Sequence, residues 1–270
     1  ALLAVPPESA AAAAPALLEA GVKVIDLSGA HRLRTGDAYP RWYQFEHPHP
    51  ALLTEAVYGL TEWCGPELKA ARLVANPGCY ATAVILALKP LMGLVDAGQV
   101  IVCDAASGVS GAGRQAGEAY SFTELCGNFK AYGVGGHKHE PEMRLALGLD
   151  ADAPFVFTAH LLPVVRGILA TIHVALRPGA GPKVSEAAIG QAYGAAYGQT
   201  PFVQALPGGR LPELRDVVGT PRAAIGFTVV AGGRRAVIVS AIDNLLKGAA
   251  SQAVQNLNAI CGFNEGEGLA

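Results

Sequence analysis

Residues 1–30 read ALLAVPPESAAAAAPALLEAGVKVIDLSGA, and their pattern indicates the fold class. The opening apolar residues are typical of a short buried strand. The alanine-rich segment that follows is predicted to be a helix, with Ser9 as its N-cap and Gly21 as its end. A second apolar strand then finishes at Ser28 and Gly29. Strand, helix and strand within about 30 residues form a βαβ unit, the repeat of a doubly wound parallel sheet.

Beyond this unit the pattern changes. Residues 31–68 hold many turn formers and most of the aromatic residues, which predicts a long excursion over the surface. Residues 71–78 are predicted to be a strand and a turn, and residues 79–95 an apolar helix. Residues 155–177 and residues 223–242 each contain consecutive runs rich in β-branched residues. This pattern indicates a mixed or antiparallel sheet. The predicted class is therefore α/β, with a partial parallel sheet and an α+β domain.

Composition narrows the range of functions. The chain has 270 residues, of which 51% are hydrophobic, and its net charge is −2 without a basic stripe. Nucleic-acid and membrane-surface binding therefore have no electrostatic support. The five cysteines are scattered without a CxxC pair, which favours a reducing, cytoplasmic compartment. No transmembrane run is present. The alanine-rich opening resembles the apolar part of a signal peptide, but its prolines and the lack of a basic region argue against that interpretation.

The motif NPGCYAT, residues 76–82, contains a cysteine with three possible roles. Cys79 could be a small buried hydrophobe, a metal ligand or a nucleophile. A strand, a Pro-Gly turn and a helix would place its sulfur beside unpaired N–H groups, which favour a thiolate and lower its pKa. The same turn would offer backbone donors to an oxyanion. The local context leaves all three roles open.

The segment YGVGGHKHEPE carries two histidines toward a predicted helix, in which Pro141 suits the first position. Either His137 or His139 could serve as a general acid/base, because imidazole titrates near neutral pH. A polar surface pair and a metal-binding HxH pair are the alternatives. The metal interpretation lacks a third ligand, because His160 and His173 lie in apolar strand patterns.

The loop SGVSGAGR, residues 107–114, directly follows an apolar strand. Its three glycines would let the backbone approach a ligand closely and present N–H groups to an anion. The spacing is not the GxGxxG dinucleotide fingerprint, so a flexible turn is the alternative.

A single arginine, Arg166, lies in the apolar run LLPVVRGIL, which is predicted to be a strand. An unpaired charge is costly to bury there. The guanidinium is therefore expected to meet a carboxylate or a phosphate, from the protein or from a ligand.

Five motifs follow one another in the order and spacing that are typical of one protein family. They are NPGCYAT, SGVSGAGR, HKHEPEM, HLLPVVRGILATIHV and AIDNLLKGAASQAVQNLN. With them the chain resembles the N-acetyl-γ-glutamyl-phosphate reductases, relatives of aspartate-semialdehyde dehydrogenase. The resemblance covers nearly the whole chain. It implies a Rossmann-type cofactor domain over 1–75 and 246–270, and a catalytic and dimerisation domain over 76–245.

The resemblance also implies a reaction. Cys79 would attack an acyl phosphate, phosphate would leave, and NADPH would reduce the thioester to a semialdehyde. His139 is the expected acid/base, with His137 as its nearest rival. The implied substrate-binding residues are Asn76, Arg114, Arg166 and Glu142. The implied cofactor-binding residues are Ser28, Gly29, Gly108, Ser110, Gly111 and Asn244. No metal is expected, and NADP(H) rather than NAD rests on the resemblance alone.

The resemblance leaves the substrate and the function open to alternatives, and the sequence departs from the family pattern in one respect. The substrate could be the longer aminoadipyl phosphate of lysine biosynthesis, or the chain could be a non-catalytic binding or assembly module. Family members begin with a glycine-rich loop for the pyrophosphate, and about 70 residues of that domain are expected before Ala1. We therefore expect the sequence to be part of a longer enzyme. A homodimer or homotetramer is expected, without nucleic-acid or membrane partners.

Overall fold

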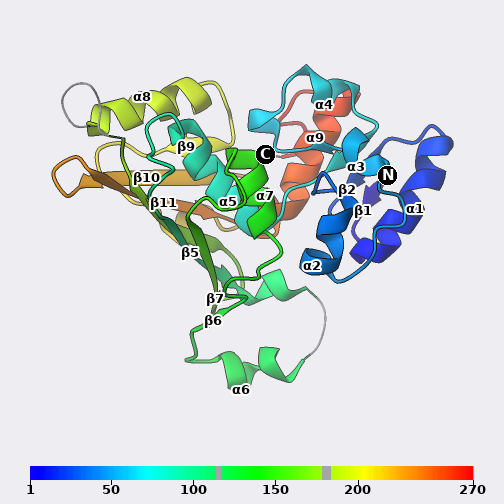
Figure 1. The fold of residues 1–270 in the computed structure, drawn as a ribbon, viewed down its shortest axis with the longest axis horizontal. Helices are drawn as coiled ribbons and strands as arrows, with labels where there is room; N and C mark the ends of the chain where they lie inside the picture. The colour runs from blue at the N-terminus through cyan, green and yellow to red at the C-terminus, as the bar shows by residue number, and fades with distance from the viewer. Residues whose placement is uncertain (114–116, 178–183, 270) are drawn as a thin grey trace. The chain divides into compact units, whose positions relative to one another are not determined.

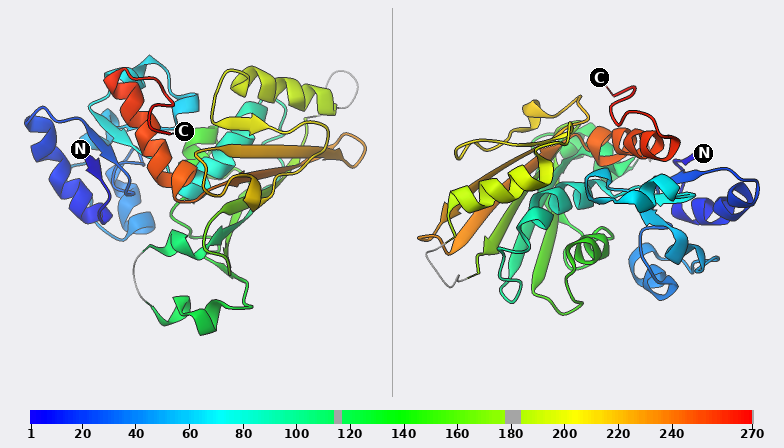
Figure 2. Two further views of the ribbon diagram at one scale, coloured as in Figure 1. Left: turned by 180° about the vertical axis from the view of Figure 1, so that it is seen from behind. Right: turned by 90° about the horizontal axis from the view of Figure 1, so that it is seen from above.

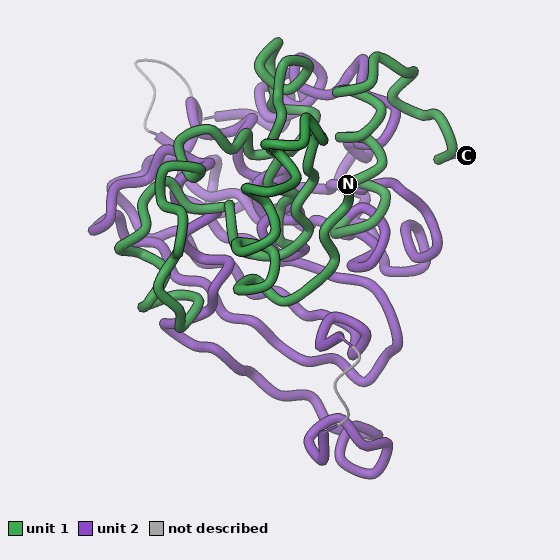
Figure 3. Tube along the Cα trace, turned by 90° about the vertical axis from the view of Figure 1, so that its right-hand side faces the viewer, with its two compact units in different colours: residues 1–78, 248–270 green, residues 79–247 purple. Residues whose placement is uncertain are grey.

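The computed structural model describes residues 1–113, 117–177 and 184–269, and the chain divides into two compact units (Figures 1 and 3). Unit 1 comprises Ala1–Gly78 and Gly248–Ala270, and unit 2 comprises Cys79–Lys247. Unit 2 is thus one uninterrupted segment, whereas unit 1 is assembled from chain on both sides of it.

Unit 1 contains a four-stranded parallel sheet with the order β1-β2-β4-β3. Its strands are β1 (Leu2–Leu3), β2 (Val24–Asp26), β3 (Val57–Tyr58) and β4 (Leu73–Ala75). Its helices are α1 (Pro7–Glu19), α2 (Tyr39–Tyr43), α3 (Leu52–Glu55), α4 (Pro66–Ala70) and α9 (Ser251–Cys261). The predicted βαβ unit is therefore confirmed as β1, α1 and β2. The predicted excursion is more structured than expected, since it contains three short helices and β3.

The two ends of α1 can be compared with the residues that were predicted to begin and end this helix. Gly21 has φ +75°, a left-handed conformation that suits glycine, and it lies just beyond the helix as predicted. The prediction of Ser9 as N-cap was wrong, because Pro6 is the N-cap and Pro7 begins the helix. A proline at the first helical position needs no hydrogen-bond partner and presets φ, so the Pro-Pro pair decides the start.

The core of unit 1 lies on both faces of its sheet. On one face α9 contributes to a cluster made of Ile25, Leu68, Ala71, Val74, Ala253 and Ile260. A second cluster is made of Leu18, Val24, Ala56 and Leu73, with Leu18 from α1. Burial on both faces explains why β2 and β4 read as continuous apolar runs rather than as alternating ones.

Unit 2 contains a seven-stranded sheet with the order β6-β7-β5-β8-β11-β10-β9. Its strands are β5 (Ile101–Gly108), β6 (Lys130–Tyr132), β7 (Phe155–Leu162), β8 (Ile168–Ala175), β9 (Val203–Ala205), β10 (Ala223–Val230) and β11 (Arg235–Ile242). The pairs β5/β7 and β9/β10 are parallel and the others are antiparallel. The predicted mixed sheet is confirmed, and with it the α/β class.

The helices of unit 2 are α5 (Cys79–Leu88), α6 (Phe122–Leu125), α7 (Glu140–Leu147) and α8 (Glu186–Tyr197). Helix α5 packs against β8 and β11 and beside α7 (Figures 1 and 2). Burial alternates along β7: Phe157 is 2% exposed and its neighbour Val156 is 46% exposed. Within unit 2 the helices therefore cover the sheet mainly on one face.

The last predicted helix is present but begins in an unusual form. Residues Leu246–Ala250 form a π-helix, and α9 continues from Ser251. Among the described residues, no helix is long and apolar enough to cross a membrane.

Candidate active site

Cys79 is the first residue of α5, as the Pro-Gly turn predicts. The thiol is half-buried, and none of the five cysteines forms a disulfide. The first N–H groups of a helix have no partner within the helix and carry a partial positive charge. A negative charge on the Cys79 sulfur is favoured at this position.

Both predicted histidines lie at the start of α7, close to Tyr80. His139 is the N-cap, and Pro141 is the second helical residue rather than the first. The Tyr80 ring centroid is 5.3 Å from that of His137 and 6.0 Å from that of His139. Since Tyr80 follows Cys79 directly, the starts of α5 and α7 meet at this tyrosine.

The two histidines are linked to each other. The backbone N–H of His139 donates to Nδ1 of His137 across 3.1 Å, and their ring centroids are 4.9 Å apart. Because Nδ1 of His137 accepts this bond, a neutral His137 carries its proton on Nε2. Burial lowers the pKa of His137 to about 4, and the charge of Lys138 adds to the effect. At neutral pH the His137 imidazole is therefore uncharged.

Two phenols complete this cluster. The hydroxyls of Tyr80 and Tyr132 are 2.9 Å apart, and Tyr80 also donates to the carbonyl oxygen of His160 across 3.1 Å. Burial raises the pKa of both phenols, and the charge of Cys79 raises it further. Both tyrosines are therefore neutral neighbours of the thiol. Sequence reasoning gave neither residue a role, although each belongs to a motif that it singled out.

The glycine-rich loop continues from β5 into a short 3-10 helix, Val109–Ala112. The N–H groups of Gly108, Val109 and Ser110 donate to the carbonyls of residues 164–167. These three donors are engaged within the protein rather than presented to an anion. A Cβ on Gly108 would lie 2.8 Å from both Val165 O and Arg166 N, so this glycine permits two backbone segments to touch.

Asn244 ties this loop to the turn before β8. Its Oδ1 accepts the N–H of Gly167 at 2.7 Å, and its Nδ2 donates to Oγ of Ser110 at 2.9 Å. The Ser110 oxygen therefore accepts, and its own proton can be donated to a ligand oxygen. Gly111 packs closely here, since a Cβ would lie 3.0 Å from Oγ of Ser107.

Arg166 lies in the turn between β7 and β8 rather than within a strand, so the expectation of a buried strand position was wrong. Its side chain is 43% exposed, and its Nη1 is 3.9 Å from the buried carboxylate of Asp243. That carboxylate also accepts the N–H groups of Gly219, Leu245 and Leu246. These backbone hydrogen bonds fix the Asp243 carboxylate. The carboxylate lies beside the Arg166 guanidinium, which is also exposed to solvent.

The other predicted residues of unit 2 are less informative. Glu142 is 1% exposed on α7. Arg114 lies outside the described residues. Within the described part of the chain, no group of three or more ligating side chains could hold a metal ion.

Unit 1 holds Asn76, Ser28 and Gly29. Asn76 is 1% exposed, and its amide group is bonded on both sides: Nδ2 donates to Ala249 O, and Oδ1 accepts from Asn256. Its carbonyl accepts Nε of the buried Arg32 at 2.8 Å. Asn76 thus holds the turn before Cys79 in place. Arg32 and Asn256 are additions that sequence reasoning missed.

The turn with Ser28 and Gly29 follows β2. The N–H of Ser28 donates to Asp26, and its Oγ accepts from Ala30. A Cβ on Gly29 would lie 1.9 Å from the Tyr43 ring, so only glycine fits there. Asp26 is buried and its Oδ2 is 2.7 Å from Nδ1 of His31. Burial raises the pKa of Asp26, but its contacts with His31 and Ser28 outweigh burial and leave it below the usual value.

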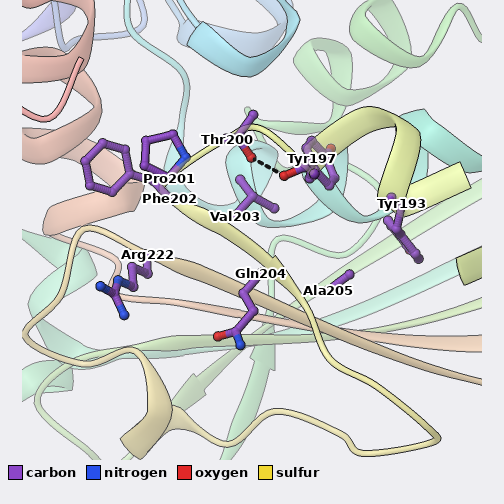
Figure 4. A pocket seen from close by; sticks show the side chains of 11 residues that line it. Tyr193, Tyr197, Thr200, Pro201, Phe202, Val203, Gln204, Ala205 and Arg222 are labelled. Atoms are coloured by element: carbon purple, nitrogen blue, oxygen red, sulfur yellow. Dashed lines mark hydrogen bonds between the residues drawn. The ribbon is translucent and has the colours of Figure 1, made fainter. Parts of the chain in front are cut away.

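A separate pocket of about 500 Å³ lies between α8 and β9. Figure 4 shows Tyr197, Phe202, Gln204 and Arg222 among its lining side chains. Of the predicted site residues that the structure describes, none lines it.

Two family models match the chain. The model described as "Semialdehyde dehydrogenase, dimerisation domain" matches residues 79–244, and "Semialdehyde dehydrogenase, NAD binding domain" matches residues 1–71. Together they account for most of the sequence.

Curated relatives carry one name. The N-acetyl-gamma-glutamyl-phosphate reductase of Pelotomaculum thermopropionicum is 48% identical over 96% of this chain and 75% of its own length. The reductase of the same name from Geobacillus stearothermophilus is 45% identical over 98% of this chain and 77% of its length.

Solved structures of similar fold are aspartate semialdehyde dehydrogenases. The Vibrio cholerae enzyme II, complexed with ASA, has a TM-score of 0.67 at 22% identity and covers 97% of this chain and 79% of its own. The Francisella tularensis enzyme has a TM-score of 0.69 at 16% identity, over 96% of this chain and 81% of its own. These likenesses establish the fold.

Proposed function

Because the chain belongs to the N-acetyl-γ-glutamyl-phosphate reductases, within the semialdehyde dehydrogenases, we propose that Cys79 is the nucleophile of their reaction. The chain is an NADP-dependent, phosphorylating reductase that forms N-acetylglutamate 5-semialdehyde from N-acetyl-γ-glutamyl phosphate, a step of arginine biosynthesis. The observation that carries the catalytic assignment is the meeting of the α5 start with both histidines at Tyr80.

Cys79 performs the first step as a thiolate. Its sulfur attacks the acyl carbon of the substrate, an S–C bond forms, and the C–O bond to phosphate breaks with its electron pair leaving on phosphate. The N–H groups at the start of α5 stabilise the negative charge on the sulfur. The product of this step is a thioester on Cys79.

His139 is the proposed proton carrier. An acid for the leaving groups must be protonated at working pH, and His137, with a pKa of about 4, is not. The bond from His139 N–H to His137 Nδ1 gives His137 another role, that of fixing the position of His139. The low pKa of His137 therefore favours His139 as the acid/base.

We propose NADP(H)-binding residues in unit 1 and, separately, in unit 2. The chemistry that bound NADPH supplies is the hydride for reduction of the thioester. The parallel sheet of unit 1 fits a dinucleotide, since Ser28 and Gly29 follow the carboxyl end of β2. In unit 2 the Ser110 hydroxyl, held by Asn244, fits an amide oxygen such as that of nicotinamide. Gly108 and Gly111 keep this loop close-packed.

Substrate anions are assigned to Arg166. Its guanidinium is partly exposed and is held from one side by Asp243, so the other side can bind a carboxylate or phosphate. We also propose Arg114 for an anion. The buried positions of Glu142 and Asn76 favour support of α7 and of the turn before Cys79 over direct contact with substrate.

The alternatives have less support. The curated relatives described above are all named for the glutamyl substrate, which disfavours aminoadipyl phosphate. A non-catalytic module is disfavoured by matches to both domains of a dehydrogenase. We propose that 1–75 with 246–270 binds the cofactor, and that 76–245 holds the catalytic and dimerisation surfaces. Oligomer formation is supported by the dimerisation model, and we propose a cytoplasmic homodimer or homotetramer.

The test is the reverse reaction on the purified protein, with N-acetylglutamate semialdehyde, phosphate and NADP, followed by the absorbance of NADPH. Cys79→Ser is expected to lower kcat by about 1000-fold or more, as loss of a covalent nucleophile does. Cys126→Ser, at an exposed cysteine, serves as the matched control and should leave the rate unchanged. A Cys79→Ser protein with near wild-type turnover would contradict the assignment.

A further inference from the structure

Tyr132 lies beside the proposed site without a role in the steps above. It ends β6, an edge strand, opposite Ala159 of β7. Its ring centroid is 5.7 Å from that of His137, and 39% of the residue is exposed. Tyr132 thus contacts the histidine cluster and is partly exposed to solvent.

The direction of its hydrogen bond follows from counting protons. Tyr80 has one hydroxyl proton, and the carbonyl oxygen of His160 can only accept it. The contact of 2.9 Å between the two phenols is then satisfied only if Tyr132 donates to Tyr80. The opposite direction would set lone pairs of Tyr80 against the His160 carbonyl at 3.1 Å.

The oxygen of Tyr132 is therefore left as an acceptor. The Tyr132 hydroxyl donates its proton to Tyr80, and the lone pairs of the Tyr132 oxygen can accept a hydrogen bond from another donor. Burial raises the pKa of Tyr132 to about 12, so the phenol stays neutral and keeps its proton. A phenol oriented in this way accepts a hydrogen bond but gives none to a thiolate or an acyl oxygen.

The substrate offers one matching group. N-acetyl-γ-glutamyl phosphate carries a carboxylate, an acyl phosphate and an amide carbonyl, all of which accept hydrogen bonds at neutral pH. Its amide N–H is its single donor, and it lies only a few bonds from the carbon that Cys79 attacks. Resting on the proposed function, we propose that Oη of Tyr132 accepts the amide N–H of the substrate and so selects N-acylated substrates.

The test compares two aldehydes in the reverse reaction: N-acetylglutamate semialdehyde and its ester analogue, 2-acetoxy-5-oxopentanoate, in which oxygen replaces the N–H. The wild type is expected to prefer the amide by about tenfold in kcat/KM, the value of one hydrogen bond. Tyr132→Phe should bring this ratio close to one by raising KM for the amide only. Tyr120→Phe, at a neighbouring exposed tyrosine, is the control and should keep the wild-type ratio.

Three outcomes would overturn the proposal. An unchanged ratio in Tyr132→Phe means that another group accepts the N–H. An equal fall of kcat for both aldehydes means that Tyr132 only supports the histidines. A wild type without preference overturns it even if the variant does not fold, which melting temperatures would reveal. Absence of turnover with both aldehydes in the wild type would instead count against the proposed function.

Discussion

The hydroxyl of Tyr193 donates to the carbonyl oxygen of Ala87 across 2.6 Å, which attaches α8 to the end of the helix that Cys79 begins. Tyr197 makes the same kind of bond to Leu86 O at 2.7 Å. Both carbonyls belong to the last turn of α5. Two tyrosines one helical turn apart therefore cap the helix of the nucleophile from α8.

Tyr193→Phe should destabilise the protein by about 1–3 kcal/mol, because it removes a buried hydrogen bond to the Ala87 carbonyl while preserving the ring. Urea denaturation of the variant and the wild type measures the difference. Tyr120→Phe, at an exposed position, should change the free energy of unfolding by much less. Equal effects of the two substitutions would show that the bond to Ala87 contributes nothing.

Substitution of the two histidines should separate their roles. His139→Gln is expected to lower kcat by about 10²–10⁴-fold, the range for loss of a general acid/base. His137→Asn should retain more activity, because its side-chain oxygen can still accept the His139 N–H, whereas His137→Leu cannot. Steady-state kinetics at saturating substrate provides the comparison. A lower kcat in His137→Asn than in His139→Gln would reverse the assignment.

His137 also predicts how stability depends on pH. Its pKa in the folded protein is about 4 instead of 6.5, so the unfolded chain binds this proton more tightly. Stability from this residue is complete above pH 6.5 and is lost as the pH falls toward 4. Between pH 7.5 and 5 the loss should be about 2 kcal/mol.

The measurement is chemical denaturation at both pH values for the wild type and His137→Asn, which cannot titrate at this position. The variant should lose less stability on acidification. His47, whose pKa burial also lowers, is present in both proteins and cancels in the comparison. Identical pH dependence in the two proteins would contradict a buried, uncharged His137.

Two glycines should respond in opposite directions to replacement by alanine. Gly108→Ala inserts a methyl group 2.8 Å from the backbone at 165–166 and should cost about 1–3 kcal/mol, with loss of activity. Gly194→Ala, inside α8, meets nothing within 4 Å and should stabilise the protein by about 0.5–1 kcal/mol without affecting kcat. Thermal and chemical denaturation, with activity assays, check both. Tolerance of Gly108→Ala would disprove the close packing at that loop.

The sequence predicted the elements that have strong local signals. The apolar runs of β2, β5, β7, β8, β10 and β11 are where they were expected, and Gly21 ends α1. The short strands β3, β6 and β9 were missed, because two or three residues give a weak signal by themselves. The equally short β1, β2 and β4 were predicted from the helix patterns that follow or precede them. Ser9 lost its predicted role because the adjacent prolines decide where the helix starts.

The candidate site was predictable in its residue types but not in its contacts. A cysteine after Pro-Gly and a histidine pair before a helix are local patterns, and the structure places both at helix starts. The bond between Asn244 and Gly167 joins residues far apart in sequence, which no local pattern encodes. The low pKa of His137 likewise depends on burial by aromatic rings from separate segments, among them Tyr80 and Phe157.

The division of the chain has a consequence for the order in which it folds during synthesis. Residues 79–247 leave the ribosome as one continuous piece and contain every strand of their sheet. The core of unit 1 needs Ala253 and Ile260, which are translated after that entire piece. One apolar face of the nascent parallel sheet therefore stays uncovered until α9 has been translated.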